Sequence, residues 1–128
     1  MPKTVVRTDA APRPGGAYSQ AIVVGSFVFT AGVTPVDPST GRVVEGDVEV
    51  QTEQTLRNLD AILRAAGSGL EHAVKATVHL ADVRRDYVAF NRAYERLMPD
   101  PKPARTTVGS DLRGVLVEID LVAEIPSR

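Results

Sequence analysis

The sequence predicts an α+β domain in which two helices cover one face of a mixed sheet. Two helical apolar patterns stand between runs of β-prone residues, and the runs lack the regular strand–helix alternation of a doubly wound fold. A chain of 128 residues is long enough for one domain, so residues 1–128 are expected to share one core. The predicted order is strand, hairpin, helix, strand, helix, strand, strand.

The first quarter of the chain predicts a strand and then a hairpin. Residues 4–7 form a short strand candidate, and the proline- and glycine-rich residues 9–16 form a loop. Residues 21–24 and 27–30 are apolar and β-prone, and the two residues between them, Gly25 and Ser26, fit a tight turn. Gly32 follows the second of these strands, where it either allows a close approach to the backbone or marks a bulge.

Two amphipathic helices are expected next. Residues 34–46 are rich in turn formers, and Asp47 is a suitable N-cap for a helix whose apolar positions continue to Ala66. Gly67 is suited to the position just after the end of this helix. Asp86 is the predicted N-cap of the second helix. The apolar stripe of that helix contains Asn91, and a buried amide needs partners, for which the neighbouring backbone is the simplest source.

Three further strands are predicted, over residues 73–80, from Arg105 onward, and over residues 115–122. Arg105 opens its strand just after Pro101 and Pro103, which cannot pair in a ladder. Glu118 stands opposite a buried face made of Val115, Val117, Ile119 and Leu121. A carboxylate among apolar neighbours is costly to bury unless it is paired or hydrogen-bonded. Either a structural Arg105–Glu118 ion pair or a functional site would explain these two charges.

Composition argues against several classes of protein. The chain has no cysteine, which excludes disulfides, thiolate metal sites and a cysteine nucleophile, and its formal net charge of −1 argues against a domain held on nucleic acid by phosphate contacts. His72 and His79 are seven residues apart, so one strand would place them on opposite faces, and no metal site is expected. The chain begins without an apolar signal core and has no membrane-spanning run, which predicts a soluble, cytoplasmic protein.

The second face of the sheet has no further element to cover it. Such a face is best buried against another copy of itself, so a closed homo-oligomer is expected.

These residues together resemble the RidA/YjgF family, in order and over nearly the whole chain. The matching segments are Gly16 to Ala21, Thr30 to Pro35, Gln51 to Gly67, Val74 to Val78, Asn91 to Tyr94, and Pro103 to Val108 through Val117-Glu118-Ile119. The resemblance implies a chorismate-mutase-like fold and a homotrimer whose sheets form a central barrel, with sites between subunits. It also implies a cofactor-free enamine/imine deaminase that hydrolyses 2-iminobutanoate and 2-iminopropanoate, products of pyridoxal-phosphate enzymes, to 2-keto acids and ammonia.

The resemblance also implies roles for individual residues. Arg105 matches the arginine that binds the substrate carboxylate, and Glu118 matches the glutamate that activates water. The other positions matching the substrate-binding set are Tyr18, Ala31, Gly32, Asn91 and Thr107. The chain departs from the usual family pattern at four positions, with Ala17 in place of proline, Ala31 of serine, Val33 of glutamine and Thr107 of cysteine. These departures bear on the substrate side chain and on catalytic efficiency.

Two other function classes are compatible with the same residues. One is a non-catalytic trimer that binds a small carboxylate or regulates a partner protein. The other is a ribonuclease or translation inhibitor, as some members of this family have been described. The near-neutral charge of the chain gives little support to the second.

Overall fold

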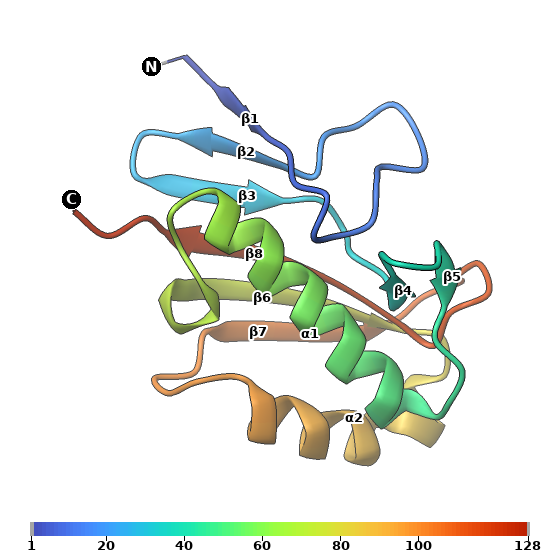
Figure 1. Ribbon diagram of the computed structural model, residues 1–128. Coiled ribbons are helices and arrows are strands. Elements are labelled where there is room, and N and C mark those ends of the chain that lie inside the picture. Colours follow the sequence, from blue (N-terminus) through green and yellow to red (C-terminus); the bar gives the residue numbers. More distant parts are fainter. Residues whose placement is uncertain (1, 128) are drawn as a thin grey trace.

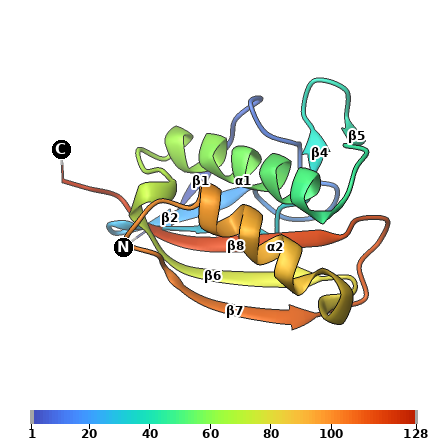
Figure 2. The ribbon, with the colours of Figure 1, turned by 90° about the horizontal axis from the view of Figure 1, so that it is seen from below.

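The computed structural model describes residues 2–127 and shows a six-stranded sheet with two helices packed on one face (Figures 1 and 2). The strands run in the order β1-β2-β3-β8-β6-β7; β6 and β7 pair in parallel, and the other neighbours in this order pair antiparallel. The elements are β1 (Thr4–Val6), β2 (Ala21–Val24), β3 (Phe27–Thr30), β4 (Val36–Asp37), β5 (Arg42–Val43), α1 (Val48–Ala65), β6 (Ala73–Leu80), α2 (Val83–Leu97), β7 (Ala104–Gly109) and β8 (Val117–Glu124), with a 3₁₀ turn at Leu70–His72. The predicted mixed α+β architecture is confirmed.

The hairpin predicted over residues 21–30 is present. β2 and β3 pair antiparallel with Val24 opposite Phe27, so Gly25 and Ser26 form a two-residue connection. Gly25 takes a φ of 59°, a conformation that only glycine adopts without strain. Glycine at the first position of such a turn matches the right-handed twist of the flanking strands.

The caps of the helices confirm one prediction and correct another. Asp47 accepts a hydrogen bond from the backbone N–H of Val50 at 3.1 Å, as expected of the α1 N-cap. The N-cap of α2 is Asp82, which accepts from the N–H of Arg85 at 3.1 Å, and the prediction of Asp86 was wrong. Asp86 lies one turn inside the helix, where its buried carboxylate pairs with the guanidinium of Arg85 at 2.8 Å.

Three strand predictions also needed correction. The turn-rich residues 34–46 contain a second, two-stranded sheet, β4–β5, with Val36 opposite Val43. The last strand begins at Val117 rather than at residue 115, and the first ends at Val6. The strands that carry Arg105 and Glu118 are not neighbours, because β6 lies between β7 and β8.

Buried amide side chains hold the small β4–β5 sheet against α1. Asn58 donates from Nδ2 to the carbonyls of Thr34 and Val36 at 3.1 and 2.8 Å. Gln51 accepts from the N–H of Leu116 at 2.8 Å, which ties the segment before β8 to the same helix. Asn58 and Gln51 therefore both bond to loop backbone, and each of these bonds fixes the position of a loop.

The core lies between the helices and one face of the sheet, while no element of residues 2–127 covers the other face (Figure 2). One row of apolar residues crosses four strands on the open face. The row is Val5, Ile22, Phe29 and Val122, paired in register. Phe29 is 46% exposed and Val5 is 52% exposed, which is a large apolar area to leave in water.

Val24, Phe27 and Val108 extend the apolar area of the open face, and polar residues of β6 and β8 occupy most of the remainder. Burial raises the pKa of Asp120, and the nearby charges of His79 and Lys75 act in the opposite direction. No helix within residues 2–127 is both long enough and apolar enough to cross a membrane.

Candidate functional site

Arg105 lies near the start of β7, the edge strand of the sheet, and points toward the helix-covered face, because its partner on β6 is the fully buried Ala76. Its guanidinium carbon lies 4.7 Å from the ring centre of Tyr94 and 5.4 Å from that of Phe90. Its Nη2 donates to the hydroxyl of Tyr87 at 3.0 Å. Aromatic faces and a neutral oxygen hold a cation in place without neutralising it.

Within residues 2–127, Arg105 forms no ion pair with a carboxylate. A cavity of about 470 Å³ opens beside its guanidinium. Its lining consists of Asn91, Tyr94, Glu95, Lys102, Pro103 and Arg105. The ammonium of Lys102 donates to backbone carbonyls at the end of α2, so the guanidinium is the cationic group that remains free for an anion.

Asn91 borders this cavity from α2, one turn beyond Tyr87. It is half-buried, and its side chain makes no hydrogen bond to any of the described residues. The backbone partners considered for Asn91 from the sequence are therefore not found. An amide with free donors and an acceptor beside an unpaired guanidinium is suited to binding a polar ligand.

Thr107 follows Arg105 on the same face of β7, opposite the buried Val78. Its Oγ1 is buried and has no hydrogen-bond partner within the described part of the chain. Buried hydroxyl groups are usually paired, because an unpaired one loses its interaction with water without replacement. Thr107 therefore has an unused hydrogen-bonding group next to the predicted anion site.

Glu118 lies on the opposite face of the sheet, in register with His79 on β6. Its carboxylate packs against the backbone of Gly32, which an isolated bridge between Val33 and Ile119 holds beside β8. A Cβ added to Gly32 would lie 2.6 Å from Oε2 of Glu118, too close for two such atoms. Glycine at this position is thus explained by close approach, the reading that the sequence left open beside a bulge.

Tyr18 and Ala31 lie near Gly32, where all three line a small cavity of about 50 Å³. Tyr18 is 54% exposed, and its hydroxyl accepts a hydrogen bond from the N–H of Gly15 at 2.9 Å. The buried Gln20 fixes the preceding loop by accepting from the N–H of Thr8 and by donating to backbone carbonyls of residues 8–12. This role of Gln20 was not predicted from the sequence, although an amide beside a proline- and glycine-rich loop is a typical anchor.

The predicted residues therefore form two separate groups. Arg105, Asn91 and Thr107 belong to the helix-covered side of the edge strand, whereas Glu118 lies on the open face with Gly32. The structural ion pair between Arg105 and Glu118 that the sequence allowed is wrong, because the strands are separated and the side chains point to opposite faces. One chain does not assemble the predicted site.

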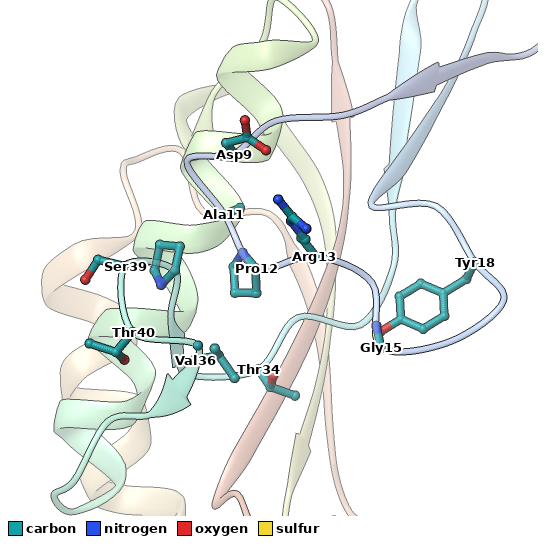
Figure 3. Close-up of a pocket in the computed structure, with 12 residues that line it drawn as sticks. Asp9, Ala11, Pro12, Arg13, Gly15, Tyr18, Thr34, Val36, Ser39 and Thr40 are labelled. Atoms are coloured by element: carbon teal, nitrogen blue, oxygen red, sulfur yellow. The ribbon is translucent and has the colours of Figure 1, made fainter.

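A larger cavity, of about 690 Å³, lies between the loop of residues 9–18 and the β4–β5 hairpin (Figure 3). Thr34, Val36, Ser39 and Thr40 form one side of it. Tyr18 reaches only its border, with the hydroxyl turned back toward Gly15 (Figure 3). Gly32, Arg105 and Glu118 are not part of its lining, so this cavity is not the predicted site.

The two histidines have structural environments. His72 lies in the 3₁₀ turn before β6 rather than in the strand, and Nδ1 of His79 is 2.7 Å from Oγ of Ser110. Within residues 2–127, no group of three or more His, Asp or Glu side chains is arranged to hold a metal ion.

The sequence of this chain is similar to those of a well-populated family. A family model described as Endoribonuclease L-PSP matches residues 8–125. A RutC family protein of Pyrococcus horikoshii is 45% identical over 123 residues, which cover 94% of this chain and 97% of that protein. The chloroplastic Reactive Intermediate Deaminase A of Arabidopsis thaliana is 41% identical over 125 residues, covering 96% of this chain and 66% of that protein.

Solved structures show the same fold. RidA from the Antarctic bacterium Psychrobacter superposes with a TM-score of 0.90 at 35% identity, covering 95% of this chain and 99% of that one. TdcF of E. coli, solved with bound serine, superposes with a TM-score of 0.88 at 32% identity, covering 97% and 99% of the two chains.

Proposed function

Since this chain belongs to the RidA/YjgF family, we propose that it is an enamine/imine deaminase that hydrolyses 2-imino acids, such as 2-iminobutanoate and 2-iminopropanoate, to 2-keto acids and ammonia. The observation that carries this proposal is the environment of Arg105. Its guanidinium lies against aromatic rings of α2 beside a cavity and has no carboxylate partner within residues 2–127. A fixed, unneutralised guanidinium is suited to binding a small carboxylate through two parallel hydrogen bonds.

In this mechanism Glu118 is the general base. The carbon of an imine is already electrophilic, so the reaction needs a positioned water and a group that accepts its proton. The oxygen of water bonds to the imine carbon, its proton passes to Glu118, and the imine nitrogen takes up a proton to give a carbinolamine. The nitrogen of the carbinolamine then takes up the proton that the hydroxyl group gives up, relayed by Glu118, while the carbon–nitrogen bond breaks and the hydroxyl oxygen becomes the carbonyl oxygen. The products are ammonia and the 2-keto acid.

The remaining family positions have supporting roles in this proposal. Tyr18 and Thr107 donate hydrogen bonds to the substrate or to the leaving nitrogen, and Asn91 binds beside Arg105. Gly32 leaves room for the Glu118 carboxylate next to the backbone. Ala31 lines the small cavity of about 50 Å³ that Tyr18 and Gly32 also line. A positioned acid–base group contributes roughly 10²–10⁴-fold to a rate, which is sufficient for a substrate that also hydrolyses without an enzyme.

The two groups of residues are brought together by assembly. We propose a homotrimer whose sheets form a central barrel, in which Arg105 of one subunit faces Glu118 of the next. The apolar row across the open face, with Phe29 near its centre, supports this assembly, since contact between copies would remove it from water. The opposite orientations of Arg105 and Glu118 in one chain support a site that two chains share.

The oligomeric state tests the assembly. Sedimentation equilibrium at micromolar concentration is expected to give about 41 kDa, three times the mass of the 13.7 kDa chain. Phe29→Lys should dissociate the trimer and abolish activity, because it would bury an unpaired ammonium in the interface. Val88→Lys, at a position on α2 that is 72% exposed, is the matched control and should remain trimeric. A monomer for the parent protein would contradict both the assembly and the shared site.

The proposed activity is tested with imines generated in the assay. An amino-acid oxidase or dehydratase is supplied with a panel of amino acids, and the decay of each imine is followed with and without this protein. We expect the protein to accelerate decay and to release one ammonia for each 2-keto acid. Unchanged decay across the panel would leave a binding protein as the better reading, an alternative that the serine bound to TdcF also favours.

The description of the family model justifies one further control. That description names an endoribonuclease, so RNA should be incubated with the same preparation. The near-neutral net charge of −1 gives the chain little electrostatic attraction for RNA, and we expect no cleavage.

A further inference from the structure

Tyr87 is the one hydrogen-bond partner of the Arg105 side chain within residues 2–127. Nη2 of Arg105 donates to the Tyr87 hydroxyl at 3.0 Å, and the guanidinium carbon lies 5.8 Å from the centre of the Tyr87 ring. Because the hydroxyl oxygen accepts this bond, its own proton is free to be donated elsewhere. Tyr87 is 40% exposed, so a ligand can reach that hydroxyl.

Tyr94 provides an instructive contrast on the same helix. Its ring is nearer to the guanidinium, at 4.7 Å, but its side chain is only 4% exposed and its hydroxyl has no partner among the described residues. Burial raises the pKa of this hydroxyl, which keeps it neutral. Tyr94 therefore contributes an aromatic face to Arg105, whereas Tyr87 contributes a hydroxyl group as well.

The position of Tyr87 on α2 aligns it with the predicted site. Tyr87 and Asn91 are separated by four residues, so they are neighbours on one face of the helix. The phenol, the amide and the guanidinium thus adjoin one another along the edge of the sheet. Two neutral donors beside a guanidinium suit a carboxylate, which has four lone-pair positions to satisfy.

From this geometry we infer that Tyr87 is a substrate-contacting residue whose hydroxyl donates to the same carboxylate that Arg105 binds, while the oxygen of that hydroxyl orients the guanidinium. The inference rests on the proposed function, in which that carboxylate belongs to a 2-imino acid. The Tyr87 hydroxyl is thus a neutral hydrogen-bond donor beside the charged guanidinium of Arg105. Arg105 and Tyr87 therefore both favour a ligand that has a carboxylate at this point over the corresponding uncharged amide.

The test compares Tyr87→Phe with a control that also loses one hydroxyl. Tyr87→Phe removes the hydroxyl and keeps the ring, whereas Ser39→Ala, the control, removes an exposed hydroxyl in the turn between β4 and β5, outside the predicted site. Titration with 2-oxobutanoate should show an affinity loss of roughly three- to tenfold for Tyr87→Phe, the range of one net hydrogen bond. Ser39→Ala should bind as the parent does. KM for imine hydrolysis should rise with Kd, while kcat changes by less than about twofold.

A second ligand separates a direct contact from a structural one. The amide 2-oxobutanamide lacks the carboxylate, so its weak binding should be about the same in the parent and in Tyr87→Phe. An equal loss for acid and amide, or no loss for the acid, would overturn the role of Tyr87. A large fall in melting temperature for Tyr87→Phe, without a change in affinity, would do so as well.

Failure of this inference can be distinguished from failure of the proposed function. If Arg105→Ala loses 2-oxobutanoate binding and Tyr87→Phe does not, only the role of Tyr87 is wrong. If neither variant changes the affinity, the carboxylate does not bind at Arg105, and the proposed function fails with the inference.

Discussion

Replacing Arg105 by lysine is expected to lower 2-keto acid affinity and kcat/KM for imine hydrolysis by about one to two decades. Lysine keeps the positive charge but loses the planar fork that binds a carboxylate through two hydrogen bonds. Losing one charge-assisted hydrogen bond costs roughly 1.5–3 kcal/mol, which corresponds to that range. Titration with 2-oxobutanoate and steady-state kinetics measure the two quantities.

Folding should be nearly unaffected by this substitution. Arg105 is on an edge strand and forms no ion pair within residues 2–127, so no buried charge loses its partner. Lysine retains part of the contact with the Tyr94 ring, whereas Arg105→Ala removes it and should be slightly less stable. A large loss of melting temperature with unchanged ligand affinity would show that Arg105 stabilises the fold and that the site lies elsewhere.

Replacing Glu118 by glutamine should reduce imine hydrolysis at least about tenfold and leave 2-keto acid binding intact. Glutamine has nearly the same shape and fits the same space beside Gly32, but an amide cannot accept the proton of the attacking water. The fall should therefore be seen in kcat, with little change in KM. This outcome separates an enzyme from a binding protein, which has no need for a base at this position.

Asp120→Asn is the matched control for Glu118→Gln. Asp120 lies two residues further along β8 on the same open face, and burial already raises its pKa, so a neutral amide should be tolerated there. We expect its imine hydrolysis rate to stay within a few-fold of the parent. If Glu118→Gln hydrolyses imines as fast as the parent, another group is the base and the binding reading gains support.

Local features of the structure were predictable because short-range physics decides them. Gly25 begins a two-residue turn, Asp47 caps α1, and Gly67 follows the end of that helix with a φ of 84°. The alternation from Val117 to Leu121 correctly separated a buried face from the face that carries Glu118. In each case the outcome depends on neighbours a few residues away.

The choice between two possible caps for α2 shows where local reasoning was insufficient. Asp82 and Asp86 are four residues apart, and either could accept a hydrogen bond from the first turn of a helix. The intervening residues are compatible with helix, so α2 begins one turn earlier, and Asp86 becomes a buried partner of Arg85. The two-residue strands β4 and β5 were missed because tertiary contacts hold this segment, among them the bonds from Asn58 of α1 to the carbonyls of Thr34 and Val36.

The sequence by itself determined the two helices and the strands of the main sheet, which residues face the core, and which charged residues are unusual for their positions. Only the tertiary structure decided that β6 separates the strands of Arg105 and Glu118, that these side chains point to opposite faces, and that Tyr87 contacts the guanidinium. The physical reason is that helix periodicity and turn chemistry act over a few residues. Strand order instead depends on pairing between segments far apart in the chain, which no local pattern specifies.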